Sequence, residues 1–185
     1  AALGYIGSSA PNLETSRPDP KDVIASMGAL DRAYQQFSEG RLEAAQASFL
    51  TLLDHAEFPP VAALEGLARI ARMKGKNVEA EAAYRELLKN DPESVAALAQ
   101  LVVLARERGN PTDAVRWAEN LTKLAPSDGG ASRLLAESLL AAGDATAAQV
   151  EWRRGLAAAP HAGWLRLGYA RFLASAKRSA EAQRE

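Results

Sequence analysis

Apolar residues recur at helical intervals through most of this chain. On one segment they are spaced i, i+3, i+4 and i+7, as one helix face requires: Leu64, Leu67, Ala68 and Ala71. Gly75 follows that face at a point where a helix ends, because glycine accepts a positive φ. A second apolar face begins at Ala80, and Pro92 then prevents that helix from continuing. The stretch predicts a helix, a glycine turn, a second helix and a proline turn.

This unit returns every 34 residues. Glycine ends the first helix of three units, at Gly75, Gly109 and Gly143. Proline follows the second helix, at Pro92, Pro126 and Pro160. An alanine column keeps the same interval, at Ala80, Ala114, Ala148 and Ala182. We expect the two helices of each hairpin to cross at these alanines, because a large residue there would overpack the crossing at a cost of about 1–3 kcal/mol.

A helix–turn–helix unit of this length and pattern resembles the tetratricopeptide repeat. The resemblance extends over residues 23–185 and implies an all-α, right-handed superhelical solenoid of about four full units and a partial fifth. The array is placed at 21–185, after a flexible linker over 1–20, with units at 23–59, 61–94, 95–128, 129–162 and 163–185. The loop at 58–60 is expected to hold one extra residue, since Gly40 precedes Gly75 by 35 residues.

The two ends of the chain leave alternatives open. Residues 1–7 read either as the tail of a removed signal or membrane anchor, or as an ordinary trimmed terminus. The compartment therefore stays open between the bacterial cytoplasm and the periplasm. In the fifth unit, Lys177 replaces the turn glycine, and we expect a second helix cut at Glu185. Such an open end needs a cap, so either the natural protein continues past Glu185, or the end is frayed or covered by another chain.

Composition narrows the range of functions. Alanine dominates, aromatic residues make up only 6%, and the clusters typical of strands are missing, which favours an all-α chain. A net charge of -1 argues against a nucleic-acid partner. No apolar run is long enough to span a membrane. The chain has no cysteine, which excludes disulfides and thiolate metal sites.

No catalytic constellation is recognisable in the sequence. The two histidines, His55 and His161, lie in separate turns, and neither has a second ligand at helical metal spacing. Phosphate-binding glycine loops and the nucleophile-elbow motif are absent as well. We therefore predict that this chain is not an enzyme and uses no cofactor and no metal.

The resemblance implies that the first helices line a concave groove for a peptide or helix of another protein. The groove positions it implies are Tyr34, Phe37, Arg69, Arg72, Arg106, Arg133, Trp164 and Arg171. The predicted function is a non-enzymatic interaction scaffold. The alternatives are a periplasmic, membrane-tethered domain of a bacterial envelope system (pilus, outer-membrane or cytochrome c biogenesis) and a self-assembling scaffold subunit that forms homo-oligomers through its open C-terminal end.

Two features of this groove each have two possible interpretations. Its five arginines either form ion pairs with Glu65, Glu107 and Glu137 or recognise an acidic ligand. The apolar stripe from Met27 to Phe37 needs a cover, from the linker or from a partner helix. The Lys/Asn clamp with which some family members bind chaperone C-termini is missing, because Gly66 stands where its second asparagine belongs.

Overall fold

The computed structural model describes residues 20–54 and 60–182, and within them every regular element is an α-helix. The first two hairpins are α1 (Pro20–Ser38) with α2 (Leu42–Leu53), and α3 (Val61–Met73) with α4 (Asn77–Asn90). The next two are α5 (Val95–Glu107) with α6 (Pro111–Leu124), and α7 (Gly129–Ala141) with α8 (Ala145–Ala158). The chain closes with α9 (Gly163–Ala182). The all-α prediction is confirmed.

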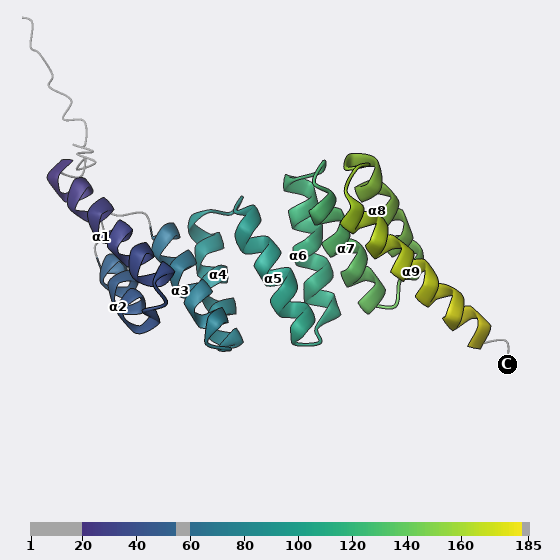
Figure 1. Cartoon of the computed structure of the whole chain (residues 1–185), viewed down its shortest axis with the longest axis horizontal. Coiled ribbons are helices and arrows are strands. Elements are labelled where there is room, and N and C mark those ends of the chain that lie inside the picture. The colour runs from purple at the N-terminus through teal and green to yellow at the C-terminus, as the bar shows by residue number, and fades with distance from the viewer. Residues whose placement is uncertain (1–19, 55–59, 183–185) are drawn as a thin grey trace, which may run out of the picture.

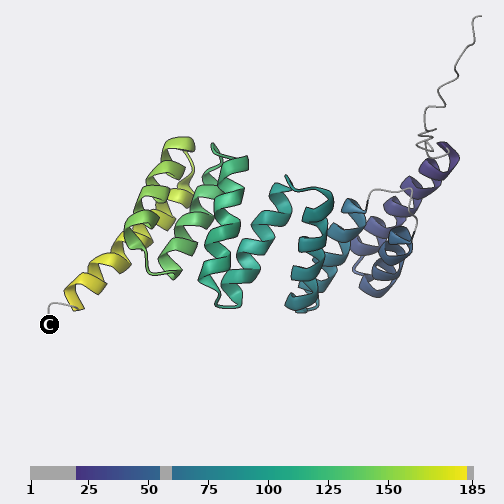
Figure 2. The ribbon, with the colours of Figure 1, turned by 180° about the vertical axis from the view of Figure 1, so that it is seen from behind.

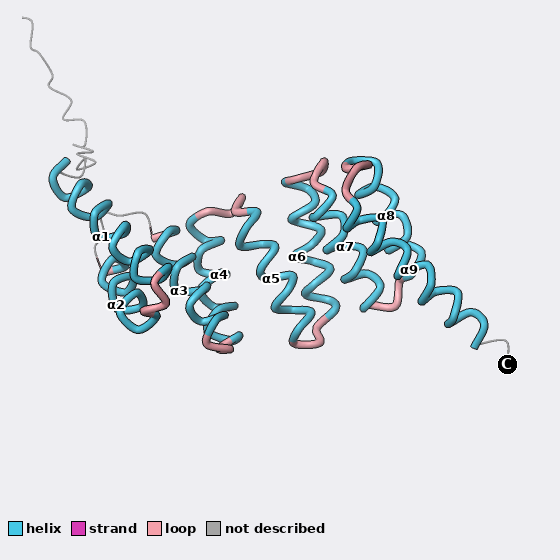
Figure 3. Tube along the Cα trace, viewed as in Figure 1, coloured by secondary structure: helices cyan, strands magenta, loops and turns pink. Residues whose placement is uncertain are grey.

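The hairpins stack side by side into an elongated solenoid, with α1 at one end and α9 at the other (Figures 1 and 2). Short turns connect α1 to α2 and each successive pair of helices from α3 to α9 (Figure 3). Each helix packs mainly on its neighbours along the chain, and the first helices of adjacent hairpins also touch. The expected linker lies outside the described residues except for Pro20, which begins α1. His55 and most of the loop at 58–60 lie outside them too.

Glycine ends the first helix of every hairpin in the left-handed conformation. The φ angle is +75° at Gly40, +70° at Gly75, +72° at Gly109 and +89° at Gly143. In each turn the residue after the glycine donates its N–H to a carbonyl five residues back, as Lys76 does to Ala71. This bond satisfies a carbonyl that the helix end leaves free. The predicted glycine turns are confirmed.

Three of the four alanines of the predicted column, and the equivalent Ala45 of the first hairpin, are buried within hairpins, whereas Ala182 lies in α9, which forms no hairpin. Ala45, Ala80, Ala114 and Ala148 are each 0% exposed. Larger side chains fill the spaces on either side of these alanines, and they form four core clusters strung along the solenoid. Since each cluster joins neighbouring hairpins, the hydrophobic core runs along the described array and is not gathered into one central cluster.

Small residues also let aromatic rings from one hairpin press onto the next. The Phe49 ring of α2 lies against Gly66 of α3, and the Trp152 indole of α8 lies against Gly168 of α9. Both aromatic side chains are buried, at 0% and 3% exposed. Gly66 therefore serves the packing between hairpins.

The fifth unit differs from the expectation. α9 runs without a break from Gly163 to Ala182, so the turn expected at Lys177 is absent and residues 178–182 continue the first helix. The physical reason is the missing glycine: a lysine with positive φ is strained, whereas a continued helix keeps every backbone hydrogen bond. α9 consequently extends past α8 at the end of the solenoid (Figure 1).

Candidate functional site

The first helices of all five units share one surface, which we call the first-helix face. Side chains join each neighbouring pair across it. The Arg69 guanidinium of α3 lies over the Phe37 ring of α1, 4.8 Å from its centroid. Ion pairs connect α3 to α5 and α5 to α7, and the Arg133 guanidinium of α7 lies 5.7 Å from the Trp164 ring centroid on α9. These contacts connect successive first helices through six of the predicted groove residues: Phe37, Arg69, Arg72, Arg106, Arg133 and Trp164.

Four of the five arginines on this face have acidic neighbours. Arg72 binds Glu107 in a bidentate pair, with an Nη2–Oε1 distance of 3.1 Å. Arg106 and Arg133 both bind Glu137, the latter at 2.8 Å. Hydrogen bonding by Arg72 holds the pKa of Glu107 below its usual value. These contacts agree with the ion-pair alternative for Arg72, Arg106 and Arg133.

The positive charge that remains is concentrated at one end of the face. Arg106 and Arg133 share the single carboxylate of Glu137, and Arg171 has no ion pair among the described residues. Beside them α9 exposes Trp164 by 50% and Leu167 by 54%. The α7–α9 end of the face is thus both cationic and apolar.

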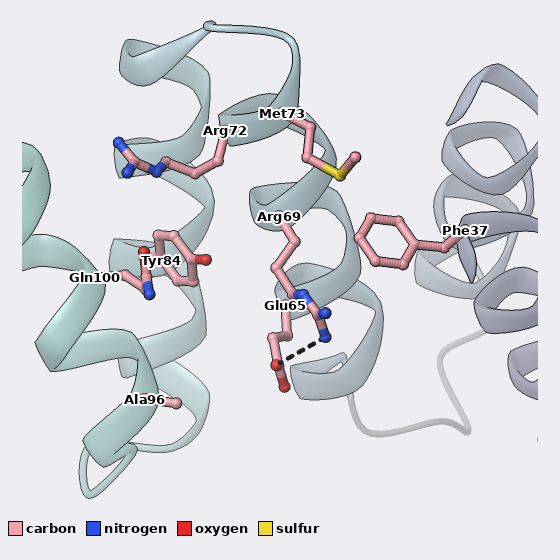
Figure 4. A pocket seen from close by; sticks show the side chains of 8 residues that line it. All are labelled: Phe37, Glu65, Arg69, Arg72, Met73, Tyr84, Ala96 and Gln100. Atoms are coloured by element: carbon pink, nitrogen blue, oxygen red, sulfur yellow. Dashed lines mark ion pairs between the residues drawn. The ribbon is translucent and has the colours of Figure 1, made fainter. Parts of the chain in front are cut away.

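A cavity of about 350 Å³ opens at the other end, between α3 and α5. Figure 4 shows that α1, α3, α4 and α5 all contribute side chains to it. The lining consists of Phe37, Glu65, Arg69, Arg72, Met73, Tyr84, Ala96 and Gln100. Three of the predicted groove residues, Phe37, Arg69 and Arg72, therefore meet around one hollow.

Arg69 is held loosely in this cavity. Its closest carboxylate, Glu65, lies 3.8 Å away, beyond hydrogen-bond distance, and 47% of the Arg69 side chain is exposed. By contrast, the Arg72 side chain is engaged by Glu107 and is only 26% exposed. Arg69 is therefore the arginine in this cavity whose donors remain available.

Tyr84 and Gln100 complete the polar lining, and sequence reasoning missed both as site residues. Tyr84 is 2% exposed and enters from α4, between the two first helices (Figure 4). Burial raises the pKa of its phenol, so it is a neutral donor at physiological pH. The available signal was its type: a buried tyrosine usually has a partner for its hydroxyl.

The structure places Tyr34 differently from the other predicted positions. Its ring packs edge-on against Phe49, at a centroid distance of 5.1 Å, and its hydroxyl donates to the carbonyl of Ala62. Tyr34 thus joins α1 to α2 and α3 and does not line the cavity. The core cluster around Phe49, to which α3 contributes, also contacts Leu30, Tyr34 and Phe37, so part of the apolar stripe is already covered. The Met27 side chain at the other end of the stripe is 57% exposed.

Among the described residues, no group of three or more histidine, aspartate and glutamate side chains could hold a metal ion. His161 is exposed in the turn before α9. None of the described helices is long and apolar enough to cross a bilayer.

Known proteins share the repeat pattern of this chain. Two tetratricopeptide repeat profiles match residues 30–95 and 71–138, which together extend over more than half of the chain. Cellulose synthase 2 operon protein C of Komagataeibacter xylinus is 33% identical over 186 residues, which cover 98% of this chain and 14% of that protein. This chain therefore spans a small part of that relative's length.

Solved structures share the fold at low sequence identity. A tetratricopeptide repeat protein from Parabacteroides merdae superposes with a TM-score of 0.77 at 20% identity, covering 87% of this chain and 64% of that one. YrrB, described as a repeat protein with an unusual peptide-binding site, superposes with a TM-score of 0.69 at 16% identity, covering 82% of this chain and 78% of that one.

The stacked helical hairpins and their shared face define an α-helical repeat protein, a class built as a solenoid of identical supersecondary units. Within that class, this chain belongs to the tetratricopeptide repeat family.

Proposed function

We propose that this chain is a non-enzymatic scaffold whose first-helix face binds a peptide or helix of another protein. The observation that carries the proposal is the cavity between α3 and α5, where the exposed Met73 side chain lies beside Tyr84 and Gln100, whose side chains make no hydrogen bond among the described residues. Binding sites on proteins are typically apolar hollows with a few directed polar groups. The peptide-binding site named for the similar protein YrrB gives further support.

The charge distribution suggests how a partner would lie along the face. Around the cavity, Arg69 faces Glu65 and Arg72 faces Glu107, so that end is close to neutral. Toward α9, two arginines share Glu137 and Arg171 has no ion pair within the described part of the chain, which leaves a positive excess. An extended partner would therefore place its apolar part near α3 and any acidic part near α9.

Peptides selected from a random library against the purified protein would test this proposal. Met73→Glu should lower their affinity at least tenfold, because it places a charge at an apolar wall that is 62% exposed in the wild type. Val150→Glu is the matched control: Val150 is 59% exposed on α8, outside the first-helix face. Equal binding by wild type and Met73→Glu, with loss in Val150→Glu, would contradict the proposal.

A second candidate function is assistance in bacterial cellulose production. It is supported by the alignment of nearly the whole chain with cellulose synthase 2 operon protein C. The test replaces the aligned segment of the Komagataeibacter xylinus protein with this chain and measures secreted cellulose. Secretion above that of a deletion of the segment would support the idea. Secretion no higher than the deletion, from a chimera present at normal level, would contradict it.

A further inference from the structure

We propose that the cavity between α3 and α5 accepts an uncharged apolar side chain of the bound peptide, together with one flanking peptide group, and discriminates against an acidic side chain. This inference rests on the proposed function, since it names the part of the partner that enters the first-helix face. It departs from the idea of an acidic ligand that the five arginines alone suggest.

Tyr84 supplies the first argument. Its side chain is almost entirely buried, yet its hydroxyl makes no hydrogen bond among the described residues and faces the cavity that it lines. The hydroxyl itself keeps contact with the water in the cavity, so a ligand that displaces this water must bring an acceptor or leave the donor unsatisfied. An acceptor atom brought in by a ligand would satisfy it.

The charges around the cavity decide which acceptor is suitable. Arg69 and Gln100 add further donors, but Glu65 stands beside them as an acceptor that receives no hydrogen bond from any described residue. A peptide group supplies both a carbonyl for the donors and an N–H for Glu65. A ligand carboxylate supplies only acceptors and would place a second negative charge beside Glu65. The neutral group therefore makes better use of the site.

The apolar wall identifies the side chain that accompanies this group. Phe37 and Met73 are the large apolar side chains of the lining, and in Figure 4 the thioether of Met73 extends toward the Phe37 ring. Met73 is 62% exposed, and methionine adapts its shape to varied apolar partners. A leucine, methionine or phenylalanine side chain between these two residues would bury apolar surface on both sides, whereas a glutamate side chain would lose its hydration there.

The chain offers a sharp probe because it contains only two methionines, Met27 and Met73. Carbon-13 labelling of the methyl groups gives two NMR signals. Met73 reports on the cavity, and Met27, ten residues and about 15 Å along α1 from Phe37, serves as the internal control. The ligands are three capped peptides: acetyl-Gly-Leu-Gly-amide, acetyl-Gly-Gln-Gly-amide and acetyl-Gly-Glu-Gly-amide.

We expect the leucine peptide to shift the Met73 signal and leave Met27 in place, with an affinity at least tenfold above that of the glutamate peptide. Tyr84→Phe removes only the hydroxyl and should lower the affinity for the leucine peptide about three- to tenfold. Tyr34→Phe, whose hydroxyl is already bonded to Ala62, is the matched control and should leave the affinity unchanged.

Three results would overturn the inference: equal or tighter binding of the glutamate peptide, no shift of Met73 with any of the peptides, or no loss of affinity in Tyr84→Phe. Each is distinguishable from failure of the proposed function. If library-selected peptides still lose affinity in Met73→Glu, the first-helix face binds peptides and only the specificity assigned to this cavity is wrong.

Discussion

Substitution of Gly66 by alanine tests the packing between the first two hairpins, because two effects of opposite sign compete there. Alanine favours a helix over glycine by about 1 kcal/mol. However, a Cβ atom on Gly66 would lie 2.5 Å from Cε2 and 2.7 Å from Cε1 of Phe49. The Phe49 ring is 0% exposed and is held on another side by Tyr34, so it has little room to move.

The magnitude follows from the balance of these two terms. Overpacking of a well-filled core costs about 1–3 kcal/mol. After the gain in helix propensity is subtracted, we expect Gly66→Ala to lower the free energy of unfolding by about 1 kcal/mol. For a chain of this size, that corresponds to a fall in Tm of about 2–4 °C.

Urea denaturation followed by circular dichroism measures the effect. Gly28→Ala on α1 is the matched control: the nearest atom to its added Cβ is Arg32 Nη1 at 3.6 Å, so propensity should dominate and stability should rise. In a Phe49→Leu background, Gly66→Ala should become harmless, since the clashing ring is gone. A Gly66→Ala protein as stable as Gly28→Ala would refute this description of the packing.

Three further predictions concern the turn at Gly109, the buried carboxyl of Glu151 and the exposed surface of α9. Gly109→Ala should cost about 1–2 kcal/mol in urea denaturation because φ is +72° there, although no atom lies near the new Cβ. Burial raises the pKa of Glu151, so this carboxyl stabilises the fold when protonated and opposes it when ionised. Glu151→Gln should therefore be more stable than wild type at pH 7, with the difference vanishing as the pH falls below about 4; a constant difference would contradict this. If α9 mediates self-association, Leu173→Glu, at a position 41% exposed, should lower the weight-average mass in sedimentation equilibrium, whereas an unchanged monomer in both proteins would exclude that route.

The fold was predictable from the sequence because each repeat unit packs against neighbouring units of the same kind. In every hairpin a glycine adopts the positive φ that ends the first helix, and an alanine fits where the two helices cross. Because these two steric requirements are the same in each hairpin, the residues recur at a fixed interval. The prediction of a turn at Lys177 was wrong, because lysine stands there in place of the glycine on which the other turns depend.

The candidate site was only partly predictable because it depends on differences between the units. The position of Tyr84 is taken by Ala118 and Trp152 in the next two units, and only the tyrosine brings a hydroxyl into the space between two first helices. The positions of the arginines on the face followed from the family resemblance. Ion pairs with Glu65, Glu107 and Glu137 were one of the two alternatives, but the sharing of Glu137 by two arginines was not foreseen, because it depends on how far α5 lies from α7.

The most direct test of the central claim is to map a library-selected peptide onto the protein by amide chemical-shift perturbation in NMR spectra. If the partner binds the first-helix face, the largest shifts will fall on α1, α3 and α5 around the cavity and continue along α7 and α9. Shifts concentrated on α2, α4, α6 and α8, with the surroundings of Met73 unchanged, would show that the partner binds elsewhere and would contradict the assignment of function to the first-helix face.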